Sequence, residues 1–276
     1  MLWALLAFVG FSVGTLGTLV GVGGGFLLVP VLVMLDPLAS GKAITSLSLT
    51  VVFFNAVSGT AGYLRQRRVD LKSGVMFAAA TVPGALLGVL LNSVLPRETF
   101  QTLLGVLLVG LGALLLRVPP RRADDNGDDE VDPELPRFEF LCWRRLPHVR
   151  HPYPVGVAIA FGVGMFSSVV GIGGGIVHVP ALTYLLNFPV HIATATSTFV
   201  LMVSSGAGMT THLLTGGLGA GGTAGLAKAA ALSAGVVVGA QVGARLAPRL
   251  SGRTLLRVLA VLMLAAGARV LWVVLA

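Results

Sequence analysis

Long apolar runs alternate with short polar or glycine-rich interruptions along the whole chain, and this pattern predicts a bundle of helices. Several of the runs hold about 20 residues without a charge, which is the length that crosses the hydrocarbon core of a bilayer at 1.5 Å per residue. We therefore expect an all-α polytopic membrane protein. The expected helices cover residues 2–20, 25–35, 42–64, 73–95, 98–117, 153–170, 175–187, 191–213, 223–246 and 253–275.

A repeated motif divides the expected helices into two series of five. The segment Gly21-Val-Gly-Gly-Gly-Phe-Leu-Leu-Val-Pro30 returns 150 positions later as Gly171-Ile-Gly-Gly-Gly-Ile-Val-His-Val-Pro180, with six of ten residues identical. Two shorter matches follow in the same order, which is the signature of an internal repeat. They pair Ala43-Ile-Thr45-Ser46 with Thr194-Ala-Thr196-Ser197, and Gly84-Ala-Leu-Leu-Gly88 with Gly239-Ala-Gln-Val-Gly243.

These matches set the expected boundaries within the chain. We predict transmembrane repeat one at residues 1–117, a polar linker at 118–151 and transmembrane repeat two at 152–276. The linker holds eight of the 11 acidic residues of the chain, together with Pro133 and Pro136. Such a composition is typical of a solvated connection rather than of a third domain.

The second helix of each series, at 25–35 and 175–187, is too short to cross a bilayer alone. Each follows the first helix of its series through a glycine-rich break. Irregular backbone at membrane depth is tolerated only where it is buried in protein or lines a cavity. We therefore expect the first two helices of each repeat to form a re-entrant hairpin or a broken helix, as in other inverted-repeat transporters.

Composition and charge agree with a membrane location and add an orientation. The chain is 55% hydrophobic and 11% charged, whereas roughly 25% of residues are charged in an average soluble domain. Basic residues cluster at 65–72, 117–150 and 245–257, beside expected helix ends, which is typical of cytoplasmic loops. A basic loop follows the third helix of repeat one but the fourth helix of repeat two, so we expect repeats of inverted topology.

The same charge distribution bears on location and partners. It predicts a multi-pass membrane protein with a cytoplasmic linker at residues 118–151. The net charge of +8 comes from these loop clusters rather than from one basic face, so a nucleic-acid partner is disfavoured. The expected partners are the lipid bilayer and a small anionic substrate, and the sequence makes no prediction of oligomeric state.

The glycine runs supply the candidate chemistry. They fall at the start of short helices, where unpaired amides and the positive end of the helix dipole favour an anion and no Cβ blocks its approach. Two such starts facing each other place two partial positive charges on one small anion, and nearby hydroxyl, amide and imidazole groups add hydrogen bonds. The candidate substrate-binding residues are Gly23, Gly24, Gly25, Thr45, Ser46, Asn55, Gly173, Gly174, Gly175, His178, Thr196, Ser197 and Gln241.

Other classes of chemistry lack the residues that they need. The five histidines show no spacing typical of a metal site, and no dinucleotide motif is complete. Away from their ends, the expected spans contain no Asp or Glu, which removes a Ser-His-Asp set and the carboxylates typical of cation sites within membranes. We expect no enzyme activity, no metal and no cofactor. His212, close to an expected loop, is predicted to lie at the surface.

The paired Gly-x-Gly-Gly-Gly…Val-Pro segments, each followed by an Ala-x-x-Thr-Ser-like stretch, resemble the sulfite exporter TauE/SafE family of anion permeases. The resemblance covers nearly the whole chain except the linker. It implies a permease of a bacterial-type inner or plasma membrane for sulfur-containing anions, such as sulfite, sulfonates, sulfoacetate or related organosulfur acids. The positions that it implies for binding are Gly23 to Gly25, Gly173 to Gly175, Thr45, Ser46, Thr196 and Ser197.

Two functions from different classes remain open at the level of sequence. The first is an alternating-access carrier whose site lies at the membrane midplane between the repeats. The second is a passive anion channel, or a membrane scaffold subunit that recruits a partner through its linker. Saturable flux with counterflow favours the carrier, and flux that rises linearly with concentration favours the channel.

Overall fold

The computed structural model describes residues 2–35, 40–92, 94, 96–117, 153–186, 188–215 and 222–275. Every element in these residues is a helix, and six of the helices are long and apolar enough to cross a membrane. The predicted all-α polytopic fold is confirmed, while the predicted linker at 118–151 lies outside the described residues. The elements are α1 (Leu2–Val20), α2 (Gly25–Leu35), α3 (Gly41–Arg65), α4 (Leu71–Asn92), α5 (Arg97–Arg117), α7 (Tyr153–Val170), α8 (Gly175–Pro180), η2 (Ala181–Leu185), α9 (Val190–Leu214), α10 (Gly222–Leu246), η4 (Ala247–Arg249) and α11 (Gly252–Leu275).

Most observed helix ends fall within about three residues of the predicted ones. The exception follows α8, where the expected helix at 175–187 is divided into an α-helix and the π-helix η2. The change comes directly after Pro180, whose ring leaves the backbone without an amide to donate. Short π-helices are rare and are often found at functional sites.

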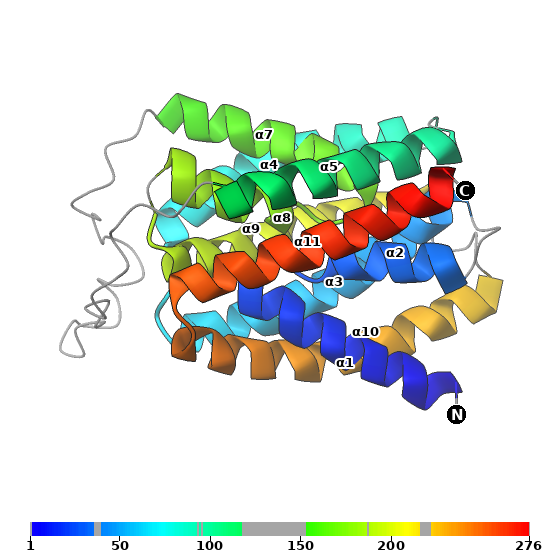
Figure 1. The fold of residues 1–276 in the computed structure, drawn as a ribbon, viewed down its shortest axis with the longest axis horizontal. Helices are drawn as coiled ribbons and strands as arrows, with labels where there is room; N and C mark the ends of the chain where they lie inside the picture. Colours follow the sequence, from blue (N-terminus) through cyan, green and yellow to red (C-terminus); the bar gives the residue numbers. More distant parts are fainter. Residues whose placement is uncertain are drawn as a thin grey trace.

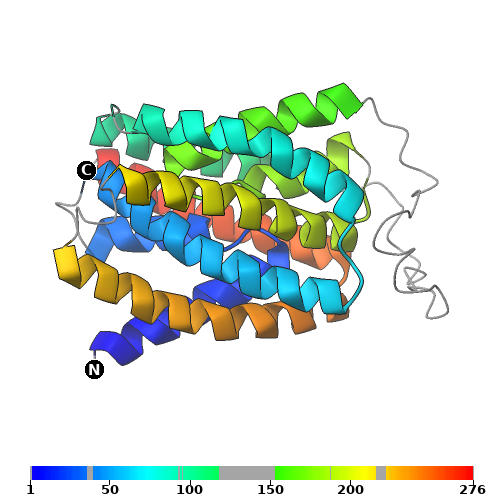
Figure 2. The same ribbon diagram turned by 180° about the vertical axis from the view of Figure 1, so that it is seen from behind.

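α1 and α2 form one hairpin, and α7 and α8 form another (Figure 1). The first hairpin enters and leaves at the end of the bundle where both termini lie, and the second at the opposite end, where α5 finishes and α7 begins. We call these the termini end and the linker end. The helices α3 to α5 and α9 to α11 run from one end to the other, as the reverse view also shows (Figure 2).

The two halves interlock through their first and fourth helices. α1 packs along α10, and α7 packs along α4. A Cβ on Gly84 would meet the carbonyl oxygen of Phe161, and a Cβ on Gly239 would meet that of Phe11. Lipid tails supply no hydrophobic force between helices, so such close backbone packing is what holds membrane helices together. Gly84 and Gly239 were matched by sequence, and they occupy equivalent places in the two interfaces.

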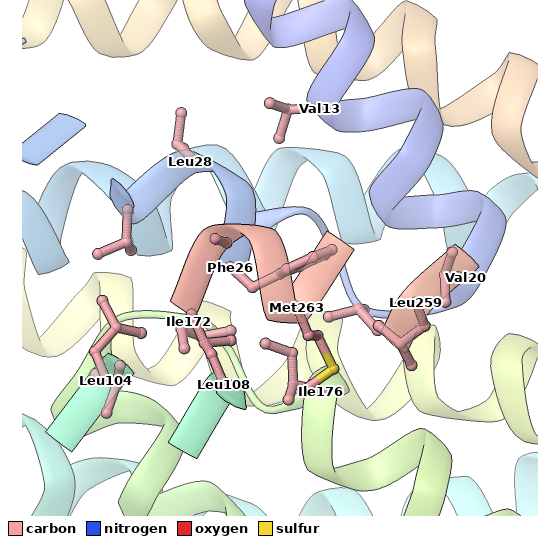
Figure 3. Packing of buried hydrophobic residues seen from close by; sticks show 14 of the residues in the cluster. Val13, Val20, Phe26, Leu28, Leu104, Leu108, Ile172, Ile176, Leu259 and Met263 are labelled. Atoms are coloured by element: carbon pink, nitrogen blue, oxygen red, sulfur yellow. The ribbon is translucent and has the colours of Figure 1, made fainter. Parts of the chain in front are cut away.

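α3 and α9 run antiparallel through the middle of the bundle, and α5 pairs with α11 beside them (Figures 1 and 2). A hydrophobic cluster joins these helices to the tips of the hairpins (Figure 3). Phe26 of α2 and Ile176 of α8 are buried in it beside Leu108 of α5 and Met263 of α11. The cluster therefore fixes the two hairpin tips, which carry the glycine motifs.

Candidate functional site

Two breaks in the helices lie at the hairpin tips. The first break, residues 21–24, joins α1 to α2, and the second break, residues 171–174, joins α7 to α8. Three glycines in each break adopt a positive φ, a conformation that other residues reach only at a cost. They are Gly21, Gly23, Gly24, Gly171, Gly173 and Gly174, with φ from +75° to +98°.

The two breaks pack directly against each other. A Cβ on Gly25 would lie 2.6 Å from the carbonyl oxygen of Ile172, and a Cβ on Gly175 would lie 2.9 Å from that of Gly21. The sequence predicts that the space left by the missing Cβ atoms lets an anion approach. In the structure the backbone of the other hairpin fills this space, so the groups that remain for a ligand are the amides.

Val52 of α3 and Leu201 of α9 each pack against both breaks. A Cβ on Gly173 would lie 2.7 Å from a methyl carbon of each side chain, and one on Gly23 would lie 3.2 Å from Val52. Both side chains are fully buried, and they occupy the same position counted from the starts of their helices. They therefore form an apolar contact at the centre of the pseudo-symmetric arrangement.

The amides at the start of each short helix are only partly satisfied. The amides of residues 21–23 donate to carbonyl groups at the end of α1, at 2.8–3.0 Å. Those of residues 24–26 donate to no acceptor in the described part of the chain, and the same holds for residues 174–176. All six residues are buried. Free amides at a helix start carry its positive partial charge, so each break presents a group that favours an anion.

Serine hydroxyls from the central helices hold the carbonyl groups of the breaks. Ser48 on α3 donates to the carbonyl oxygen of Gly171 at 2.7 Å, and Ser197 on α9 donates to that of Gly21 at 3.0 Å. Each serine thus holds the break of the other half. Ser197 is a predicted site residue, whereas Ser48 was missed because the sequence match ended two residues before it.

The structure changes the register in which α3 and α9 correspond. The sequence match pairs residues 45–46 with 196–197. In the structure, Thr45 packs on the second break and Thr194 on the first, with their Cα atoms 2.9 Å and 2.7 Å from the Cβ position of the glycine that opens the break. The true equivalents are therefore 149 positions apart. The glycine motifs that precede these helices are 150 positions apart. The connection into α9 is one residue shorter than the connection into α3, so the spacing falls to 149 in these helices.

Two predicted site residues, Thr196 and Gln241, form hydrogen bonds to other parts of the bundle. The Thr196 hydroxyl oxygen accepts from the amide of Asp70 at 3.0 Å, just before α4. Gln241 donates through Nε2 to the carbonyl oxygen of Ser58 at 2.7 Å and to its hydroxyl at 2.9 Å. Both side chains therefore have structural partners, and none of these partners belongs to a break.

Replacing Thr196 by valine is expected to lower the free energy of unfolding by about 0.5–1.5 kcal/mol, because the Asp70 amide loses its acceptor. The KM for transport should stay unchanged. Thermal unfolding of the purified protein and initial transport rates measure the two quantities. Thr210→Val is the matched control, since that hydroxyl bonds only to its own helix, at the carbonyl oxygen of Gly206. A raised KM in the Thr196 variant alone would return this residue to the site.

Three other predicted residues are buried, and each keeps one polar atom without a partner among the residues that the structure describes. These atoms are Asn55 Nδ2, Ser46 Oγ and His178 Nε2. The other end of the Asn55 amide is fixed, because its Oδ1 accepts from the Thr18 hydroxyl at 3.2 Å. Buried polar atoms without a partner are rare in native proteins, so these three are available to a ligand.

Comparison with known protein families identifies the chain as a transporter. The family model of the sulfite exporter TauE/SafE matches residues 6–270, nearly its whole length. The chain belongs to this family. The resemblance carried by the glycine motifs is thereby confirmed. The TauE/SafE family consists of membrane transporters and not of enzymes, which agrees with the prediction of no enzyme activity.

Curated relatives of the chain are also described as membrane transporters. The probable membrane transporter protein YunE of Bacillus subtilis is 29% identical over 222 residues, covering 78% of this chain and 80% of that protein. A probable membrane transporter protein of Methanocaldococcus jannaschii is 28% identical over 218 residues, covering 77% of this chain and 73% of its own. No solved structure matches the chain. Together with the six apolar helices, these relatives establish a multi-pass membrane transporter.

Proposed function

We propose that this TauE/SafE protein is a secondary carrier of small sulfur-containing anions, such as sulfite, sulfonates or organosulfur acids. The observation that carries the proposal is the meeting of two buried helix starts with free amides at one place in the bundle. The family description, which names sulfite export, supports the class of anion.

The anion is held without a full positive charge. Each helix start contributes roughly half an elementary charge through its amides, and two of them together balance a monovalent anion. Asn55 Nδ2 and His178 Nε2, both unpaired, add hydrogen bonds from α3 and α8. A site made of dipoles binds reversibly, which suits a carrier that must also release its substrate.

Alternating access follows from the two hairpins. They enter from opposite ends of the bundle and meet at their tips, where Val52 and Leu201 form an apolar contact with both. In the proposed cycle, withdrawal of one hairpin tip from this contact opens the site to one end, and withdrawal of the other opens it to the opposite end. Residues 1–117 and 152–276 are then inverted repeats around one midplane site.

The charges at the helix ends support an orientation. α3 ends at Arg65, α5 at Arg117 and α10 beside Arg245, and all three ends lie at the linker end of the bundle. Under the positive-inside rule this end faces the cytoplasm of a cell with the protein in its inner or plasma membrane. The linker at 118–151 is then cytoplasmic, and both termini lie on the other side.

Flux measurements in proteoliposomes test the function. Radiolabelled sulfite inside the vesicles should exchange with external sulfite, and its initial rate should saturate with concentration. Counterflow driven by unlabelled sulfite distinguishes a carrier, whereas a rate that rises linearly without counterflow would establish the channel. Absence of sulfite, sulfonate and chloride flux from a folded protein would favour the scaffold.

A further inference from the structure

Within the part of the chain that the structure describes, four buried polar atoms near the termini end have no hydrogen-bond partner, and the proposed central site does not use them. They are Ser46 Oγ on α3, Asn92 Oδ1 on α4, and both ring nitrogens of His212 on α9. The three residues expose 1%, 4% and 0% of their surfaces. His212 was predicted to lie at the surface, and this prediction is wrong. We call the three residues the polar layer.

Contacts one helical turn away bring the polar layer together. A Cβ on Gly208 of α9 would lie 2.9 Å from Leu49 of α3 and 3.8 Å from Val89 of α4. Residues three or four positions apart lie on the same face of a helix. One turn further toward the termini end, the same faces of α9, α3 and α4 carry the imidazole, the hydroxyl and the amide of the polar layer.

Hydrogen bonds around the polar layer fix its geometry. Asn92 Nδ2 donates to the carbonyl oxygen of Val169 at 2.7 Å and to Thr45 Oγ1 at 3.4 Å, so its Oδ1 is the unpaired acceptor. One turn beyond, Lys42 Nζ donates to the carbonyl oxygen of Thr215 at 3.0 Å and joins the ends of α3 and α9. This ammonium places a positive charge between the layer and the termini end.

The linker end provides an internal comparison. The positions equivalent to Ser46, Asn92 and His212 in the other half are Ala195, Ala247 and Tyr63. These three are buried in one cluster of mostly apolar side chains. The Tyr63 hydroxyl is satisfied, because it donates to the carbonyl oxygen of Thr18 at 2.6 Å. Repeat packing therefore does not require a polar layer, and its presence at one end only needs a separate explanation.

We propose that the polar layer is a second binding site, for a small oxyanion that keeps one proton. Oxygens of such an anion accept from the Ser46 hydroxyl, one His212 nitrogen and the Lys42 ammonium, while its own hydroxyl donates to Asn92 Oδ1. A fully deprotonated oxyanion has no donor for Asn92 and leaves that buried oxygen unpaired, which costs affinity. The site then receives or releases substrate at the termini end, before or after the central site.

The class of ligand rests on the proposed anion transport, whereas the site itself rests on the unpaired atoms. Histidine-labelled full-length protein in detergent gives a local measurement by NMR. The His212 resonance is the one absent from His212→Tyr. Sulfite, which is partly protonated near neutral pH, is expected to shift this resonance until it saturates. Sulfate, which carries no proton, is expected to shift it less at equal concentration.

Variants that copy the linker end complete the test. Ser46→Ala with Asn92→Ala should abolish the sulfite-dependent shift, whereas Ser233→Ala, which also loses a buried unpaired hydroxyl, should retain it. In proteoliposomes the double variant should raise the KM for sulfite at the termini end about tenfold and leave the linker end unchanged. Ser46→Ala alone serves if the double variant does not fold.

The outcomes separate this inference from the proposed function. A His212 shift without any flux would support the polar layer and contradict the carrier. Flux with no His212 shift in the unaltered protein would overturn the polar layer and leave the carrier intact. An equal shift for sulfite and sulfate would overturn it, because the ligand then needs no proton for Asn92. A shift unchanged in the double variant would also overturn it, because Ser46 and Asn92 then do not contribute to binding.

Discussion

Alanine at Gly24 is expected to destabilise the protein by about 2–5 kcal/mol, whereas alanine at the equivalent Gly174 should cost about 1–2 kcal/mol. Both glycines have positive φ, at +75° and +98°, and this strain accounts for about 1–2 kcal/mol at each. The difference arises from the surroundings. A Cβ on Gly24 would lie 2.7 Å from the carbonyl oxygen of Val13, whereas one on Gly174 would lie 3.3 Å from the Ser167 hydroxyl. Overpacking against backbone adds about 1–3 kcal/mol to the first variant.

Equilibrium unfolding in mixed micelles measures the free energy of unfolding of both variants. Transport per folded molecule shows whether the molecules that still fold are active. Gly110→Ala is the control, because a Cβ there would meet nothing within 4 Å. Within a helix that change should be neutral or stabilising by up to about 1 kcal/mol. Equal losses at Gly24 and Gly174 would show that backbone strain dominates and that the packing of the first break on α1 contributes little.

The fold followed from the sequence because its determinants are local. Apolar length alone identifies a spanning helix, and the short second helices after glycine runs identify the hairpins. The match of Gly84 with Gly239 located a backbone contact, since only glycine permits helices to approach so closely. Each of these signals lies within one segment of the chain, so no knowledge of distant contacts was needed.

The site was predicted less completely because it depends on the rotation of helices relative to one another. Successive residues on a helix are about 100° apart, so a register error of two residues selects a different face. For this reason Thr196 was assigned to the site although it holds Asp70, and Ser48 was missed. The burial of His212 was missed for a related reason. Distance from a loop indicates depth along a helix but not which face contacts its neighbours.

Removing both serines that hold the breaks is expected to cost about 2–6 kcal/mol. Each hydroxyl satisfies a buried carbonyl group, that of Gly171 for Ser48 and that of Gly21 for Ser197. An acceptor left unsatisfied in a buried place costs about 1–3 kcal/mol. Unfolding of Ser48→Ala, Ser197→Ala and the double variant in mixed micelles gives the three energies. Transport per folded molecule should also fall, because the bonds between the two halves position the free amides of both breaks.

Thr50→Ala is the matched control for this series, since its buried hydroxyl bonds only within its own helix, to the carbonyl oxygen of Ser46 at 2.8 Å. It should change the free energy of unfolding by less than either serine variant. The double variant also tests whether the two halves act as one unit. Losses that add would mean that each break is held independently, since separate sites usually contribute independently. A double loss clearly larger than the sum would mean that one break is held more firmly once the other is released, which is the behaviour that the proposed alternation between two hairpins requires. A double loss clearly smaller than the sum would mean that release of one break also frees the other, which would contradict that alternation.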